Sequence, residues 1–126
     1  MGLSHNLMLC QKKMNDKIQK TARCLMTMLA AHDFAGLESW SKGVRLTQAE
    51  MATAIREYGS ILVVPPGLTI PELDVVKVTR ADTERWSVGI PLWTMEEGRS
   101  DLTLEVTMIG SGRELMDVEI DDINVK

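Results

Sequence analysis

The stretch RWSVGIPLWTMEEGRSDLTLEVTM, which runs from Arg85 to Met108, decides the fold of this chain. Apolar and polar residues alternate on both sides of the polar segment MEEGRS, and a period of two is typical of strands that bury one face. We therefore predict strands over residues 85–94 and 101–108, joined by MEEGRS as the connection of a hairpin. Gly98 supplies the positive φ that such a loop often needs.

Two further strands are predicted on either side of this hairpin. Residues 73–79 form a β-branched run, and residues 115–125 have the sequence LMDVEIDDINV. In the second segment the inward apolar residues change phase, so a bulge or a strong twist around Asp121 and Asp122 must absorb one residue. Pro91 cannot donate a backbone hydrogen bond, so its strand is predicted to be locally an edge or to carry a bulge there. The inward residues of the last strand are Val118, Ile120, Ile123 and Val125.

The first half of the chain predicts helices. Apolar residues recur at spacings of three and four in a long helix, which begins at Asn15 or Asp16 or earlier, after an N-terminal segment of residues 1–13 that we expect to be mobile. Asp33 is the predicted N-cap of a short second helix that turns Leu37 inward. The apolar stripe of the long helix consists of Ile18, Ala22, Leu25, Met26 and Leu29.

A third helix has clear start and stop signals. Thr47 and Glu50 fit the T-x-x-E capping box, and Gly59 occupies the position of a left-handed C-terminal cap. Helices followed by an antiparallel meander predict an α+β fold, with the N-terminal helices packed on a curved sheet of about four strands. At 126 residues, with 44% hydrophobic and 25% charged, the chain is expected to form one domain over residues 1–126.

The sequence lacks the motifs that are typical of several functional classes. No apolar run is long enough to cross a membrane and no secretory signal is recognised, so we expect a cytoplasmic protein without a membrane partner. Cys10 and Cys24 belong to no C-x-x-C pair and are expected to be reduced. Phosphate-loop, nucleophile-elbow and zinc-protease motifs are missing, so we expect no cofactor. The adjacent His32 and Asp33 predict a helix cap more than a catalytic pair.

Charge is unevenly distributed along the chain. The net charge is −4, but residues 94–126 carry nine acidic and three basic side chains, a net charge of −6. Nucleic-acid binding depends on lysine and arginine, so this part is not expected to bind nucleic acid. It suits a basic protein partner instead. The acidic residues between positions 117 and 122 lack the spacing of a calcium loop, and we expect no metal site there.

The order of elements, with the phrases AAHDFAGLESW and VEIDDINV, resembles the nuclear-transport-factor-2-like, cystatin-like superfamily over about residues 14–126. The resemblance implies a curved antiparallel sheet wrapped around helices into a cone with a pocket. Members include isomerases, dehydratases, binding scaffolds and bacterial immunity proteins. The segments AIREYG, WSVGIPLWTMEEGRSDLTLEVT and VEIDDINV are more narrowly similar to an uncharacterised bacterial domain family. No catalytic residue is carried over from the resemblance.

Three hypotheses for function follow. The first is a non-catalytic binding protein, of the kind that includes bacterial immunity proteins, which neutralises a basic toxin domain through an acidic sheet face. The second is a small-molecule or isomerase-like pocket lined by Tyr58 and Trp86. The third is a homodimer that buries the open sheet face with Trp93. The predicted partner-binding residues of the first hypothesis are Glu96, Glu97, Asp101, Glu119, Asp121, Asp122 and Trp93.

Overall fold

Three helices precede five strands in the part of the chain that the structure describes. The computed structural model describes residues 2–65, 72–78 and 83–125, with side chains from Lys13 onward. The helices are α1 (Gly2–Ala30), α2 (Phe34–Ser41) and α3 (Gln48–Tyr58). The strands are β1 (Leu62–Val63), β2 (Asp74–Val78), β3 (Arg85–Thr94), β4 (Gly98–Ile109) and β5 (Asp117–Val125).

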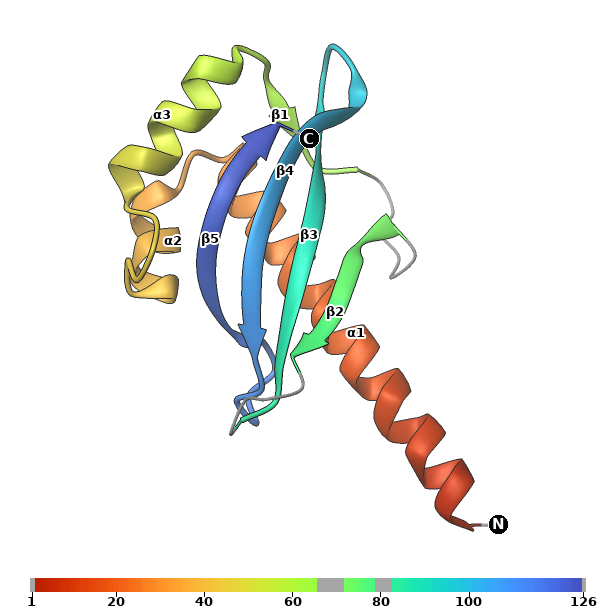
Figure 1. The fold of residues 1–126 in the computed structure, drawn as a ribbon. Coiled ribbons are helices and arrows are strands. Elements are labelled where there is room, and N and C mark those ends of the chain that lie inside the picture. The colour runs from red at the N-terminus through yellow and green to blue at the C-terminus, as the bar shows by residue number, and fades with distance from the viewer. Residues whose placement is uncertain (1, 66–71, 79–82, 126) are drawn as a thin grey trace.

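The strands form one antiparallel sheet with the order β1-β3-β4-β5, and β2 also pairs with β3. Helix α1 lies behind this curved sheet, and α2 and α3 lie beside β5 (Figure 1). The predicted α+β fold, with helices packed on a curved antiparallel sheet, is therefore confirmed. The number of strands differs slightly from the predicted four, because the two-residue β1 pairs with the end of β3.

The predicted hairpin joins β3 and β4. Thr94 pairs with Gly98, residues 95–97 form the turn, and Gly98 has a φ of 71°. β3 spans residues 85–94 as predicted. β4 begins three residues earlier than predicted, because the ladder continues past the alternating apolar residues to the turn.

Both features predicted for the strand at Pro91, a bulge and a local edge, are observed. The register between β3 and β4 shifts between Pro91 and Trp93, which is a bulge. On the other side of β3, β2 pairs as far as Gly89 and β1 begins to pair at Trp93. The missing N–H of the proline therefore falls between the two short strands and costs neither of these ladders a hydrogen bond.

The predicted caps of α2 and α3 are confirmed. Asp33 accepts a hydrogen bond from the backbone N–H of Gly36 at 3.1 Å. Thr47 and Glu50 form the complete capping box, and Gly59 ends α3 with a φ of 83°. These caps satisfy backbone groups that the helix ends leave without intrahelical partners.

Helix α1 is longer than a start at Asn15 or Asp16 would give. It begins at Gly2, and Asn15 and Asp16 lie exposed in its middle. Cap-forming residues tolerate a solvent-facing position inside a helix, and no proline precedes them to force a start there. The predicted apolar stripe of α1 is confirmed, since Ile18, Leu25 and Leu29 are almost fully buried.

The core lies between α1 and the inner face of the sheet. Alternate residues of β3 and β4 supply this face as predicted, and Trp86 is among them with 7% of its surface exposed. The outer face of the sheet is turned away from α1 (Figure 1), and no described helix lies over it. The buried residues of the two long strands are Trp86, Val88, Ile90, Leu92, Leu102, Leu104, Val106 and Met108.

The predicted bulge in β5 is confirmed. Glu105 pairs with Asp122 and Val106 pairs with Ile120, so Asp121 is the extra residue on β5. Val118, Ile120 and Ile123 consequently all reach the core. Val125 was predicted to be inward as well, but 62% of its surface is exposed because it lies opposite Leu102 at the end of the edge strand.

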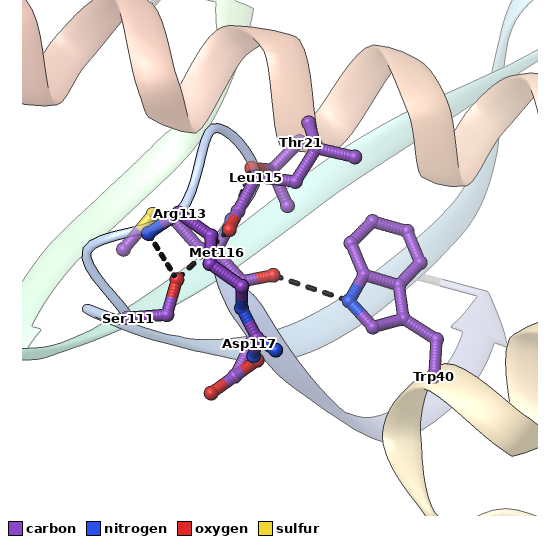
Figure 2. A network of polar contacts seen from close by, with 7 residues as sticks. All are labelled: Thr21, Trp40, Ser111, Arg113, Leu115, Met116 and Asp117. Carbon is purple, nitrogen blue, oxygen red and sulfur yellow. Dashed lines mark hydrogen bonds and ion pairs between the residues drawn. The ribbon is translucent and has the colours of Figure 1, made fainter.

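One residue of the turn before β5, Met116, is hydrogen-bonded to both α1 and α2 (Figure 2). Its side chain is fully buried, and its backbone N–H donates to Oγ1 of Thr21 on α1 at 3.2 Å. Its carbonyl accepts a hydrogen bond from Nε1 of Trp40 on α2, also at 3.2 Å. Both backbone groups of a buried residue are thus satisfied by side chains of two different helices.

The same turn is closed by its own polar residues. The hydroxyl of Ser111 donates to the carbonyl of Leu115 at 2.9 Å and accepts from the backbone N–H of Arg113 at 3.2 Å. Arg113 in turn pairs with Asp117 at the start of β5 (Figure 2). The turn therefore presents Met116 to α1 and α2 in a defined conformation.

Replacing Thr21 by valine should destabilise the protein because it leaves the buried N–H of Met116 without an acceptor. We expect a loss of about 1–3 kcal/mol in the free energy of unfolding, measured by urea denaturation. Thr27→Val is the matched control. Thr27 makes the same i−4 hydrogen bond to its own helix as Thr21, but it is exposed. Equal losses for both variants would contradict the role given to Thr21.

Candidate functional site

The predicted partner-binding acids lie in two separate places. Glu96 and Glu97 are in the turn between β3 and β4, whereas Glu119, Asp121 and Asp122 lie on β5. Asp122 pairs with Glu105, which is seven residues along β4 from Gly98, or roughly 24 Å. Asp101 is exposed on β4 between the two groups. The structure therefore does not gather the six acids into one site.

The acids of the hairpin turn have structural partners. The hydroxyl of Tyr58 donates to Glu97 at 2.7 Å, and this hydrogen bond is the largest cause that raises the pKa of Tyr58. The backbone N–H of Ile61 donates to Glu96 at 3.2 Å. Both carboxylates thus connect the turn to the end of α3 and the segment that follows it, which gives them a role in the fold.

The acids of β5 form a cluster on the outer face of the sheet. The bulge places Asp121 and Asp122 on this face in succession, next to Glu105 on β4. Thr107 donates to Oδ2 of Asp121 at 2.8 Å, and the amide of Asn124 donates to both Glu105 and Asp122, at 2.9 and 2.7 Å. We call Glu105, Glu119, Asp121 and Asp122 the β5 carboxylate cluster.

Two arginines offset part of the negative charge of this cluster. Nε of Arg45 lies 3.0 Å from Oδ1 of Asp121, although the geometry is too bent for a hydrogen bond. Arg85 lies 3.8 Å from Glu119. Neither of these two ion pairs involves Asp122, which is the exposed carboxylate of the cluster.

The carboxyl group of Asp121 is perturbed by its surroundings. Partial burial raises its pKa above the ordinary 3.8, and the charges of Glu119 and Glu105 raise it further. The hydrogen bond from Thr107 and the charge of Arg45 act in the opposite direction. Burial is the largest of these causes, so the raised pKa reflects mainly the partial removal of this carboxyl group from water.

An open groove lies between α3 and β5, beside the cluster. It has a volume of about 360 Å³, and Asp122 belongs to both the groove and the cluster. We call it the α3–β5 groove. Its lining residues are Leu46, Ala49, Glu50, Thr53, Ala54, Glu57, Asp122 and Ile123.

The predicted pocket residues do not line this groove and do not lie together. Tyr58 reaches the hairpin turn, whereas Trp86 is buried in the core, eight residues or roughly 27 Å along β3 from Thr94. Lys77 lies over the ring of Trp86, 5.8 Å from its centroid. The α3–β5 groove is thus lined by other residues, which the sequence did not indicate.

Trp93 and the His32–Asp33 pair have local roles in the structure. Trp93 is half-buried and packs over Gly98 across the hairpin. Asp33 caps α2, and the ring of His32 stacks on Phe34 with 5.5 Å between centroids. The predicted structural cap is therefore confirmed.

Sequence reasoning missed several residues of the cluster and the groove. Glu105 and Thr107 alternate with buried residues of β4, so their outward direction could have been read from the pattern. Asn124 lies two residues from Asp122 on β5, whereas Arg45 reaches Asp121 only because the segment before α3 lies beside β5. No sequence pattern predicts the contact between Arg45 and Asp121.

Two negative findings apply to the described part of the chain. Residues 2–65, 72–78 and 83–125 contain no group of three or more His, Cys, Asp or Glu side chains placed to hold a metal ion. Among the same residues, no helix combines the length and apolar character needed to cross a membrane.

The chain belongs to a family described as a domain of unknown function (DUF7668), which matches residues 26–126. The matched segment begins within α1 and includes both the β5 carboxylate cluster and the α3–β5 groove. No curated protein and no solved structure shows a significant match to the chain.

The raised pKa of Asp121 predicts a pH dependence of stability. The folded protein holds this proton more tightly than the unfolded chain, so the stability contributed by Asp121 is present below the unfolded pKa of 3.8 and is lost as the pH rises through the folded pKa. We expect Asp121→Asn to gain stability relative to the unmodified protein as the pH increases from about 3 to about 7.

Urea denaturation at each pH measures this difference in unfolding free energy. Asp16→Asn on the exposed surface of α1 is the matched control for the loss of one negative charge. If Asp121→Asn instead lost stability relative to the unmodified protein as the pH increased, the prediction would be contradicted.

Proposed function

We propose that the protein is a non-catalytic binding protein that receives a basic protein domain on the outer face of β4 and β5. The observation that carries the proposal is the β5 carboxylate cluster, which concentrates negative charge on a face of the sheet that no described helix covers. Complementary charge accelerates association and selects partners of the opposite sign. The excess of acidic over basic side chains in residues 94–126 also favours a basic partner.

We further propose that the partner is a toxin domain and that the protein acts as a bacterial immunity protein. This step follows the resemblance to the nuclear-transport-factor-2-like superfamily, in which immunity proteins occur. A basic nuclease would present the charge that the cluster lacks. Asp121 supports the proposal because a cation placed beside it would favour its ionised form.

The internal contacts of the cluster define what a partner can use. The amide of Asn124 donates to both Glu105 and Asp122. Asp121 accepts a hydrogen bond from Thr107 and forms an ion pair with Arg45. These contacts hold the carboxylates in fixed positions before binding, which lowers the cost of ordering them in a complex. Carboxylate oxygens accept more than one hydrogen bond, so further donors from a partner can be added.

The experiment is affinity capture from bacterial lysate at increasing salt, followed by affinity measurement with the purified captured protein. We expect a partner with a basic domain, and we expect its binding to weaken steeply with salt. The variant Glu119→Gln/Asp122→Asn should bind about tenfold more weakly, which corresponds to about 1.4 kcal/mol. It removes two charges while keeping the size of the side chains.

The matched control removes two charges on the α1 side of the molecule. Asp16→Asn/Glu114→Gln has the same net charge as the test variant, and Glu114 lies by α1 at 3.8 Å from Lys20. The control should bind like the unmodified protein. Equal weakening by both variants, or binding that does not respond to salt, would overturn the proposed surface.

A further inference from the structure

We propose that the α3–β5 groove is the binding site for an arginine side chain of the basic partner. The inference rests on the proposed function and adds to it the residue type that the partner inserts. It is carried by the position of the groove, by its apolar lining and by the acids at its margin.

The hollow arises from the residues that α3 turns toward β5. Ala49, Thr53 and Glu57 recur at a spacing of four and therefore share one side of the helix, and Leu46 lies just before it. Alanine and threonine side chains are short, so they leave space between the helix and Ile123. α3 contacts the core through the neighbouring stripe of Met51 and Ile55, so the groove lies outside the packed interior.

The chemistry of the lining selects a cation with an apolar stem. Leu46, Ala54 and Ile123 provide apolar surface, and the three charged residues of the lining are all acids. Among the described residues, no hydrogen bond or ion pair involves Glu57, so its carboxylate is available to a ligand. The charged residues are Glu50, Glu57 and Asp122.

Arginine fits this combination better than lysine. Its methylene groups can cover the apolar surface while its planar guanidinium donates to a carboxylate at the margin. Carboxylates that receive a guanidinium in this way form strong, directional hydrogen bonds. The volume of about 360 Å³ lies within the range of small-ligand sites.

The groove is continuous with the proposed binding face. Asp122 lines the groove and also belongs to the β5 carboxylate cluster. Its Oδ1 accepts a hydrogen bond from the backbone N–H of Ile123 at 2.9 Å, and its Oδ2 accepts one from the amide of Asn124 at 2.7 Å. A single basic partner can therefore cover the cluster and insert one side chain beside it. Arginine residues buried in such recesses are among the strongest contributors to binding at protein interfaces.

The test is a titration of the isotopically labelled protein with N-acetyl-arginine amide, followed by amide chemical shifts in NMR spectra. We expect saturable shifts at Ala49, Thr53, Ala54 and Ile123, with a dissociation constant on the order of 1 mM. N-acetyl-lysine amide should bind at least about threefold more weakly. N-acetyl-norleucine amide, which has no charge, should give no saturable shifts.

Variants locate the bound probe. Thr53→Leu should fill the groove and abolish the shifts, whereas Gln48→Leu, an exposed position of α3 outside the groove, should leave them unchanged. Glu57→Gln should weaken binding about threefold to tenfold. Binding that survives Thr53→Leu, or equal affinity for the arginine, lysine and norleucine probes, would overturn the inference.

The probe needs no partner, so this inference and the proposed function can fail separately. Saturable shifts confined to Glu105, Glu119 and Asp121 would overturn the groove as the arginine site while keeping the cluster as a cationic surface. Groove binding by the probe without any basic partner in the capture experiment would support the inference and count against the proposed function.

Discussion

The bulge in β5 keeps Ile120 and Ile123 on the buried face of the sheet while Asp121 and Asp122 both reach the outer face. A regular strand would alternate, and one of these two carboxylates would then point toward the core. The extra residue thus satisfies two demands at once. The hydrophobic layer stays continuous, and the edge strand carries adjacent negative charges, which also discourage pairing with a strand of another chain.

The α3–β5 groove depends on the bulge in β5 and on the position of α2 and α3. Asp122 and Ile123, directly after the extra residue, form one wall of the α3–β5 groove. The opposite wall is α3, and the short helices are held at this edge because Trp40 of α2 donates to the carbonyl of Met116. The turn before β5 and the bulge in β5 therefore determine both the fold at this edge of the sheet and the shape of the candidate site.

Much of the fold was predictable because local signals and burial agree in this sequence. The alternation in β3 and β4, the capping box at Thr47 and the phase change at Asp121 each report a local constraint that the structure retains. The start of α1 was less predictable, because Asn15 and Asp16 resemble caps yet lie exposed inside a helix.

The candidate site was predictable only in part because its residues come from distant segments. The sequence indicated Glu119, Asp121 and Asp122 as a group, and the structure places them on one face. It also indicated Glu96 and Glu97, whose carboxylates bind Ile61 and Tyr58 instead, through contacts 35 and 39 residues apart in the chain. Such contacts depend on how helices dock against the sheet, which the pattern of a single segment does not encode.

The most direct test of this account is the free energy of unfolding of a variant that lacks one of the two aspartates. Deleting Asp121 or Asp122 gives the same sequence, VEIDINV, in which apolar and polar residues alternate without a phase change. All ladder pairs on either side of the bulge can then be kept. If the bulge only compensates the phase change that the extra aspartate introduces, urea denaturation should give a value within about 1 kcal/mol of that of the unmodified protein, or higher. A loss of more than about 3 kcal/mol would show that the core itself requires the bulge, and it would contradict the account.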